Sequence, residues 1–256
     1  MGKSDKKRIL LKIGSNVLTK ETNIISKNKI KNIARQISAL KRKYEFVIVS
    51  SGAIVAAKEL VTLEGKELTV KQALASIGQP YLMRMYQDIF KEMGLLTSQC
   101  LLSYSDFEKK QSKENIVNTI NILVENNYIP IINENDTVAT DEIKFGDNDK
   151  LGALTAALLN VDLFIIASNT NGIYTKESIN LNNVQTIKRV SDIKSLKKEI
   201  NDIKSTHGTG GMATKIEAAT IVQKANIETW IVNGLNDNFI ADAIHDKSDF
   251  TKIITK

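Results

Sequence analysis

The segment Gly208–Lys215, with the sequence GTGGMATK, combines residue types that suit phosphate binding. Its glycines let backbone N–H groups approach an anion closely, and the helical pattern that follows places a positive helix N-terminus beside them. Lys215 adds a full charge, and His207 precedes the loop, where it could contact a nucleotide or stay solvated. The order is not that of a P-loop, because the ending Gly-Lys-Ser/Thr is absent. Taken alone, the segment fits a phosphate cradle and a flexible surface loop equally well.

Other polar clusters follow segments that read as buried strands. Lys12 lies near the end of the first such strand, where a lysine is costly unless it meets an anion or reaches water from an edge, and we predict an anion. Ser50–Ala53 could hold a carboxylate or phosphate on its backbone N–H groups, or form a simple tight turn. Asn133–Asp136 and Gly146–Lys150 concentrate carboxylates that could bind a cation, hold a metal or orient lysines. Helix caps and ordinary turns explain the same residues, so both readings stay open.

Composition argues against several kinds of site. The 256 residues include one cysteine and two histidines. A single cysteine excludes an internal disulfide framework, and so few cysteines and histidines argue against a zinc site and against Ser-His-Asp catalysis. Cys100 lies in an apolar run and is predicted to occupy a buried strand position rather than to react. The net charge of +6 suits anionic ligands, whereas dispersed lysines and few aromatic residues argue against nucleic acid as a partner. No apolar run approaches a membrane span and the N-terminus lacks the form of a signal peptide, so we expect a cytoplasmic protein without a membrane partner.

Strand and helix patterns alternate along the chain, which predicts a parallel sheet covered by helices on both faces. Ser26 is expected to cap a helix whose apolar residues recur at helical spacing. A capping box at Thr69–Gln72 is expected to start a long helix that is kinked or interrupted near Pro80 and ends near Met93. We predict strands at 8–13, 46–49, 98–102, 129–132, 163–166, 229–232 and 250–254, a hairpin at 138–144, and further helices at 150–159, 191–203 and from the glycine loop to 225. Another predicted helix carries the apolar residues Ile116, Val117, Ile120, Leu123 and Val124.

The polar clusters should meet at one edge of this sheet. Ligands of open parallel sheets bind beyond the carboxyl ends of the strands, and the clusters at Lys12–Ser15, Ser51-Gly52 and Asn133–Asp136 each lie at or just after the end of a predicted strand. The same holds for Ser168-Asn169 and Asn233-Gly234. With neither an internal repeat nor a clear boundary, residues 1–256 are expected to form a single domain with two functional halves.

Five segments, in the same order along the chain, resemble the amino acid kinase family. The resemblance implies an α/β fold, a three-layer α-β-α sandwich with a central, mostly parallel sheet. Two of the segments resemble more specifically the branch that uses ATP to convert the γ-carboxylate of L-glutamate into γ-glutamyl phosphate, the first step of proline biosynthesis. They are PIINENDTVAT (Pro130–Thr140) and IKFGDNDKLGAL (Ile143–Leu154), and the other three are KIGSNVLT (Lys12–Thr19), IVSSGAI (Ile48–Ile54) and GTGGMATK (Gly208–Lys215).

The resemblance also implies a role for individual residues. Lys12 and Lys215 would neutralise the transferring phosphoryl group as catalytic residues, and Asp149 would hold both lysines in place. The substrate-binding residues for glutamate would be Ser51, Asp136 and Asn148. Family members usually have Thr-Asp where this chain has Ser168-Asn169. Contacts to ATP would come from Lys12, Ser168, Asn169, Thr209, Gly210, Gly211, Met212, Ala213, Thr214 and Lys215, and Mg²⁺ would be bound mainly through the ATP phosphates rather than by protein ligands.

The residue chemistry agrees with phosphorylation of a carboxylate. The side chain of glutamate has a pKa near 4.3 and is ionised at neutral pH, so the reaction needs no general base. Two anions must instead be brought together while negative charge is stabilised, for which two lysines, glycine-loop N–H groups and Mg²⁺ suffice. The α-amino cation of glutamate explains an anionic partner such as Asp136. The rival readings are a relative acting on another small acid and a catalytically silent sensor on the same fold.

The resemblance implies partners as well. Proline is expected as a feedback inhibitor, with residues 133–149 as a plausible place for it to act, and the subunits are expected to form a homo-oligomer, a dimer or a tetramer. Glutamate-5-semialdehyde dehydrogenase is the enzyme expected to receive the labile product. Many members carry an additional C-terminal PUA domain, whereas this chain ends at Lys256 and is expected to be a short form without it.

Overall fold

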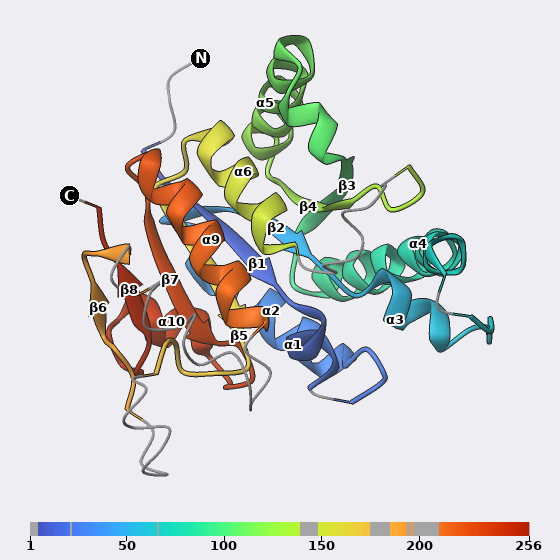
Figure 1. Ribbon diagram of the computed structural model, residues 1–256, viewed down its shortest axis with the longest axis horizontal. Helices are drawn as coiled ribbons and strands as arrows, with labels where there is room; N and C mark the ends of the chain where they lie inside the picture. The colour runs from blue at the N-terminus through green and yellow to red at the C-terminus, as the bar shows by residue number, and fades with distance from the viewer. Residues whose placement is uncertain are drawn as a thin grey trace.

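The computed structural model describes residues 5–20, 22–65, 67–138, 148–174, 185–193, 196 and 210–255. Within these residues the strands form one eight-stranded sheet in the order β3-β4-β2-β1-β5-β7-β8-β6 (Figure 1). Every neighbouring pair is parallel except β7 and β8, which are antiparallel. The strands are β1 (Lys7–Ile13), β2 (Tyr44–Ser50), β3 (Leu96–Leu102), β4 (Tyr128–Glu134), β5 (Leu163–Ser168), β6 (Arg189–Val190), β7 (Glu228–Asn233) and β8 (Thr251–Ile253).

Helices cover both faces of this sheet, which confirms the predicted three-layer sandwich. One apolar core lies between the sheet and α1, α2, α3, α4 and α10, and a second lies between the sheet and α5, α6 and α9. The helices are α1 (Ser15–Thr19), α2 (Lys27–Leu40), α3 (Ala53–Lys58), α4 (Leu68–Glu92), α5 (Lys110–Glu125), α6 (Asp149–Leu159), α9 (Gly210–Lys224) and α10 (Phe239–Ile244), and a short 3₁₀ helix spans Tyr104–Phe107. In Figure 1, α6 and α9 lie side by side over the middle of the sheet.

Alternation along β1 decides which layer Lys12 faces. Ile9, Leu11 and Ile13 belong to the core beneath α2 and α4, whereas Leu10 belongs to the core beneath α6 and α9. Because side chains alternate between the two faces of a strand, Lys12 points to the same side as Leu10. The strand therefore delivers the Lys12 ammonium group to the α6–α9 layer at the carboxyl edge of the sheet.

The long helix α4 differs from its prediction in two respects. It begins at Leu68 after Glu67, which makes no side-chain capping bond, so the predicted capping box at Thr69–Gln72 is wrong. It also continues through Pro80 to Glu92, so an interruption there is wrong, whereas the alternative of a kink at Pro80 stays a prediction. A proline inside a helix costs about 3 kcal/mol, but each large side chain buried along α4 returns about 1.5–3 kcal/mol. Packing on both sides of Pro80 therefore keeps the helix continuous.

A glycine in α4 brings this helix against α3. A Cβ atom at Gly78 would overlap the carbonyl oxygen of Ala53, the first residue of α3, and would lie 2.6 Å from the backbone N of Ala57. The backbones of the two helices therefore touch at this point, and only glycine fits there. The contact fixes the position of the next residue in α4, Gln79, relative to the end of β2.

The other predicted elements agree with the structure to within a few residues. Ser26 caps α2, where its side chain accepts a hydrogen bond from the backbone N of Lys29. Cys100 lies in β3 as expected, but it is half-buried rather than buried, and its burial raises the pKa of the thiol. The short helices α1 and α10 were not predicted. The hairpin predicted at 138–144 lies almost entirely outside the described residues, as does most of the helix predicted at 191–203.

Candidate active site

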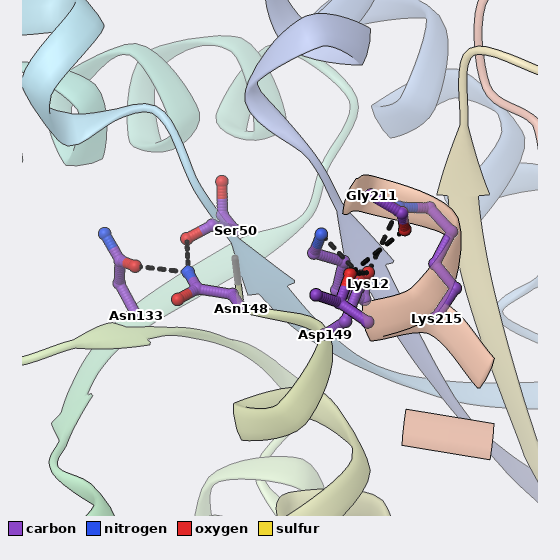
Figure 2. A network of polar contacts seen from close by, with 8 residues as sticks. Lys12, Ser50, Asn133, Asn148, Asp149, Gly211 and Lys215 are labelled. Carbon is purple, nitrogen blue, oxygen red and sulfur yellow. Dashed lines mark hydrogen bonds and ion pairs between the residues drawn. The ribbon is translucent and has the colours of Figure 1, made fainter. Parts of the chain in front are cut away.

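Three charged side chains from distant parts of the sequence meet at the carboxyl edge of the sheet (Figure 2). Nζ of Lys12, near the end of β1, lies 2.6 Å from Oδ1 of Asp149, the first residue of α6. Nζ of Lys215 in α9 lies 3.1 Å from the other carboxylate oxygen, Oδ2. The Asp149 side chain is fully buried, and those of Lys12 and Lys215 are 3% and 11% exposed. One carboxylate therefore faces two ammonium groups, and the cluster keeps a net positive charge that suits an anionic ligand.

The first turn of α9 shapes this cluster further. Lys215 Nζ donates to the carbonyl oxygen of Gly211 at 2.9 Å, and Thr214 Oγ1 lies 3.1 Å from Oδ2 of Asp149. Within its described residues α9 begins at Gly210, so the backbone N–H groups of Gly210–Ala213 have no acceptor in this part of the helix. The positive end of the helix and the Lys215 ammonium group thus lie together, an arrangement suited to phosphate oxygens.

A chain of buried amides lies beside the charged cluster (Figure 2). Asn148, immediately before Asp149, donates through Nδ2 to the carbonyl oxygen of Ser50 at 3.0 Å and to Oδ1 of Asn133 at 2.6 Å. Asn133 in turn donates through Nδ2 to Oε1 of Gln79 at 2.8 Å. The side chain of Asn148 does not cap α6, so a cap does not account for its position.

Ser51 and Asp136 lie at the same edge of the sheet. The backbone N of Ser51 donates to the carbonyl oxygen of Ile13 at 3.0 Å, which ties the turn after β2 to the end of β1. Asp136 follows the end of β4 and is partly buried. Burial raises the pKa of the Asp136 carboxyl to about 6, because the charged form loses hydration. A cationic ligand beside Asp136 would stabilise the charged carboxylate and lower its pKa again.

The predicted nucleotide-contacting pair follows β5. Ser168 is 5% exposed, and its carbonyl oxygen accepts from the backbone N of Gly234 at 2.7 Å, which joins the ends of β5 and β7. Its hydroxyl lies 3.5 Å from Oγ1 of Thr170, and Asn169 is exposed beside it. Thr209 lies outside the described residues, as do His207, Gly146 and Asp147. The structure thus places both members of the pair at the same sheet edge as the charged cluster.

Three features of the site were missed. Gln79 was not singled out, although it accepts from Asn133 in the amide chain, and the hydroxyl of Thr214 was not expected on Asp149. Tyr86 is fully buried in α4, and its hydroxyl lies 2.9 Å from Oγ of Ser50. The available signal was spacing, because Gln79 and Tyr86 are seven residues apart and so share one face of a helix. This spacing places both residues on one helix face only if the helix continues through Pro80, which the sequence alone did not predict.

Two kinds of feature are absent from the described part of the chain. Among those residues, no group of three or more His, Cys, Asp or Glu side chains is arranged to hold a metal ion. No helix within the same ranges is long and apolar enough to cross a membrane.

Comparison with solved structures bears on the fold. UMP kinase from Ureaplasma parvum superposes with a TM-score of 0.67 at 20% identity, over 98% of this chain and 99% of that one. A carbamate kinase from Giardia lamblia superposes with a TM-score of 0.68 at 15% identity, again over 98% and 99% of the two chains. At these identities the likeness establishes the shared architecture alone.

Sequence comparison is more specific. The model of the amino acid kinase family matches residues 7–233. A glutamate 5-kinase from Alkaliphilus metalliredigens is 41% identical over 91% of this chain and 90% of its own length, and one from Clostridium acetobutylicum is 36% identical over 99% and 96%. One from Vibrio vulnificus is 38% identical over 98% of this chain and 67% of its own length. The chain therefore belongs to the amino acid kinase family, and within that family to the group of the glutamate 5-kinases.

Proposed function

We propose that this protein is an ATP-dependent kinase that phosphorylates the γ-carboxylate of L-glutamate to give γ-glutamyl phosphate, the first step of proline biosynthesis. The observation that carries the proposal is the buried cluster of Lys12, Asp149 and Lys215. It supplies two ammonium groups at the sheet edge where the α9 N-terminus and the acidic Asp136 also lie. The identity of 36–41% to glutamate 5-kinases over nearly the whole chain supports the same reaction.

The two lysines are assigned to the transferring phosphoryl group. A γ-carboxylate oxygen attacks the γ-phosphorus of ATP, the bond from that phosphorus to the bridging oxygen breaks, and ADP leaves with the electron pair. No proton moves, so the protein has to position two anions and balance the charge that spreads over the phosphoryl oxygens. Lys12 and Lys215 supply that balance, and Asp149 holds their ammonium groups at a fixed separation.

ATP is assigned to the α9 end of the site. The backbone N–H groups of Gly210–Ala213 would donate hydrogen bonds to its phosphates, with Ser168 at the end of β5, Asn169 immediately after it, and Thr209 directly before Gly210 in the sequence. Both oxygens of Asp149 already face lysines, so this carboxylate is not arranged as a metal ligand. Mg²⁺ would therefore be held mainly by the phosphates of ATP, where it supplies further neutralisation of charge.

Glutamate is assigned to the other end of the site. Asp136 provides an anion for the α-ammonium group, and its raised pKa reflects a carboxylate that lacks hydration before a cation arrives. Asn148 and the turn at Ser51 complete the binding groups at the ends of β2 and α6. The order of these elements also supports a single domain whose N-terminal half binds mainly glutamate and whose C-terminal half binds mainly ATP.

The experiment that tests the function is ATP turnover with Mg²⁺ and hydroxylamine, which traps acyl phosphates as hydroxamates. Glutamate, acetylglutamate and aspartate are compared at equal concentration. Hydroxamate formed only with glutamate supports the proposal. Product from another acid would retain the mechanism and overturn the substrate, and no product from any acid would favour a silent sensor on this fold.

Further proposals follow from kinship with the glutamate 5-kinases. We propose a cytoplasmic homo-oligomer that is inhibited by proline and passes its labile product to glutamate-5-semialdehyde dehydrogenase. Light scattering tests the oligomer, and addition of proline to the hydroxamate assay tests the inhibition.

A further inference from the structure

The buried amide chain includes a residue of α4 that has no assigned role, Gln79, whose Nε2 also donates to Oε1 of Gln99 in β3 at 3.4 Å. Asn133, Asn148 and Gln79 are 4%, 6% and 8% exposed, and they link β4, the residue before α6, and α4. The bond from Asn133 Nδ2 to Gln79 Oε1 is 2.8 Å long and joins residues 54 apart in sequence. Amides this deeply buried are costly unless each polar atom finds a partner, so their arrangement constrains their orientations.

Two backbone groups fix the direction of every bond in the chain. Asn148 Nδ2 faces the carbonyl oxygen of Ser50, which can only accept. The backbone N–H of Glu134, which can only donate, lies 2.9 Å from Asn133 Oδ1. Asn133 must therefore turn its oxygen toward Asn148 and its NH₂ group toward Gln79, which accepts the hydrogen bond through Oε1. Gln79 is the partner that satisfies the Asn133 NH₂ group.

The consequence appears at Asn148. Its Nδ2 hydrogens are donated to Ser50 and Asn133, and no group in the described part of the chain donates to its Oδ1. Asn148 therefore offers a ligand an acceptor and no donor. A substrate carboxylate needs donors and an ammonium group needs acceptors, so this oxygen matches the α-ammonium group of an amino acid, as does the carboxylate of Asp136.

We propose that Gln79 is a positioning residue that sets the specificity for an α-amino group by holding the Asn133 amide, and through it the Asn148 oxygen, in the orientation that accepts from that ammonium group. This inference rests on the proposed function. Gln79 itself is held in place by the contact of its neighbour Gly78 with α3, and two turns later by the hydroxyl of Tyr86 on Ser50.

Loss of the Gln79 amide leaves the NH₂ group of Asn133 buried without an acceptor. An unsatisfied buried donor is relieved by rotation of the amide, which withdraws Oδ1 from Asn148. The charged cluster does not depend on Gln79, because Asp149 is bound by Lys12, Lys215 and Thr214. The loss should therefore weaken recognition of the ammonium group and leave the phosphoryl transfer step largely unchanged.

The test compares glutamate with glutarate, which has both carboxylates and lacks the α-amino group. In Gln79→Met, which matches the length of glutamine without its amide, the KM for glutamate should rise about tenfold, as expected for one misaligned charge-assisted hydrogen bond. The inhibition constant of glutarate against glutamate and the kcat should each stay within about threefold of the wild-type values. Gln79→Glu keeps an acceptor for Asn133 and should restore most of the discrimination.

Controls separate the possible failures. Gln111→Met makes the same change in an exposed amide pair on α5, where Gln111 bonds Asn115 at 3.1 Å, and should leave all constants unchanged. Gln79→Asn withdraws the amide by one methylene and supplies the measurement if Gln79→Met does not fold. Equal losses for glutamate and glutarate, or no loss for either, would overturn the inference while the function stands. A wild-type protein that forms no hydroxamate from glutamate would overturn both.

Discussion

Substitution of Lys215 by methionine separates the contribution of this lysine to catalysis from its contribution to stability. Methionine keeps the length and apolar stem of the side chain and removes its charge. Removal of one group that stabilises transition-state charge typically costs about 2.7–4 kcal/mol, so kcat should fall by about 10²–10³-fold. The hydroxamate assay at saturating glutamate and ATP measures this loss.

The loss of stability should be smaller than that for an ordinary broken buried ion pair. Removing one partner of such a pair costs about 3–5 kcal/mol, because the other charge is left uncompensated. Here Asp149 keeps Lys12 at 2.6 Å and the hydroxyl of Thr214 at 3.1 Å. We therefore expect a loss of about 1.5–3 kcal/mol in the free energy of unfolding, the range for one hydrogen bond to a charged group. Urea unfolding of wild type and variant measures it.

A matched control lies on the same helix. Lys224 is the last residue of α9 and is exposed, so Lys224→Met should change neither kcat nor the unfolding midpoint appreciably. A kcat for Lys215→Met within threefold of the wild-type value would refute the assignment of Lys215 to the phosphoryl group. A stability loss above 4 kcal/mol would refute the claim that Lys12 and Thr214 suffice to hold Asp149.

Three further predictions concern α4 and Asp136. Burial raises the pKa of Asp136 to about 6, so the carboxylate that attracts the ammonium group is lost as pH falls through 6. The KM for glutamate should rise about tenfold between pH 7 and pH 5, with about a tenth of Asp136 ionised at the lower pH, and Asp136→Asn should have a higher KM that no longer varies over this range. Gly78→Ala should lower the free energy of unfolding measured in urea, because its Cβ would overlap the Ala53 carbonyl oxygen. At an open site the same change would stabilise a helix by about 1 kcal/mol, so a stabilised variant would disprove the close contact between the helices. Tyr86→Phe should lower the free energy of unfolding by only about 0.5–1.5 kcal/mol, because Ser50 Oγ still donates to the carbonyl oxygen of Ser51 at 2.9 Å, and a loss above 3 kcal/mol would contradict that reasoning.

Much of the architecture could be predicted because it depends on local pattern. The apolar runs in β1, β2 and β5 are continuous, as buried parallel strands require, and each is followed by polar residues. The rule that ligands bind at the carboxyl ends of strands then brings Lys12 and Asp149 to one edge. The ion pairs at Lys12 and Lys215 are present, whereas the catalytic roles of these residues stay predictions.

What could not be predicted depends on contacts between distant segments. Lys29 lies in a helix whose start was predicted, yet it is fully buried, because Nζ donates to the carbonyl oxygens of Leu235 and Asn236. Burial lowers the pKa of this lysine. Nothing near Lys29 in the sequence distinguishes it from a solvated lysine. Gln79 was missed for the same reason, since its partner Asn133 is identified only by the packing of α4 against the sheet.

The two halves of the site are joined by a single peptide bond. Asn148 belongs to the amide chain and Asp149 to the lysine cluster, and consecutive Cα atoms are held about 3.8 Å apart by covalent geometry. The start of α6 therefore sets the distance between the group assigned to glutamate, Asn148, and the group that holds the two lysines, Asp149. A displacement of this helix end moves both residues together and preserves the distance between the two sites assigned to glutamate and ATP. Substitutions in the loops around either reactant should consequently leave the distance between the reactants unchanged, provided that Asn148 and Asp149 keep their positions.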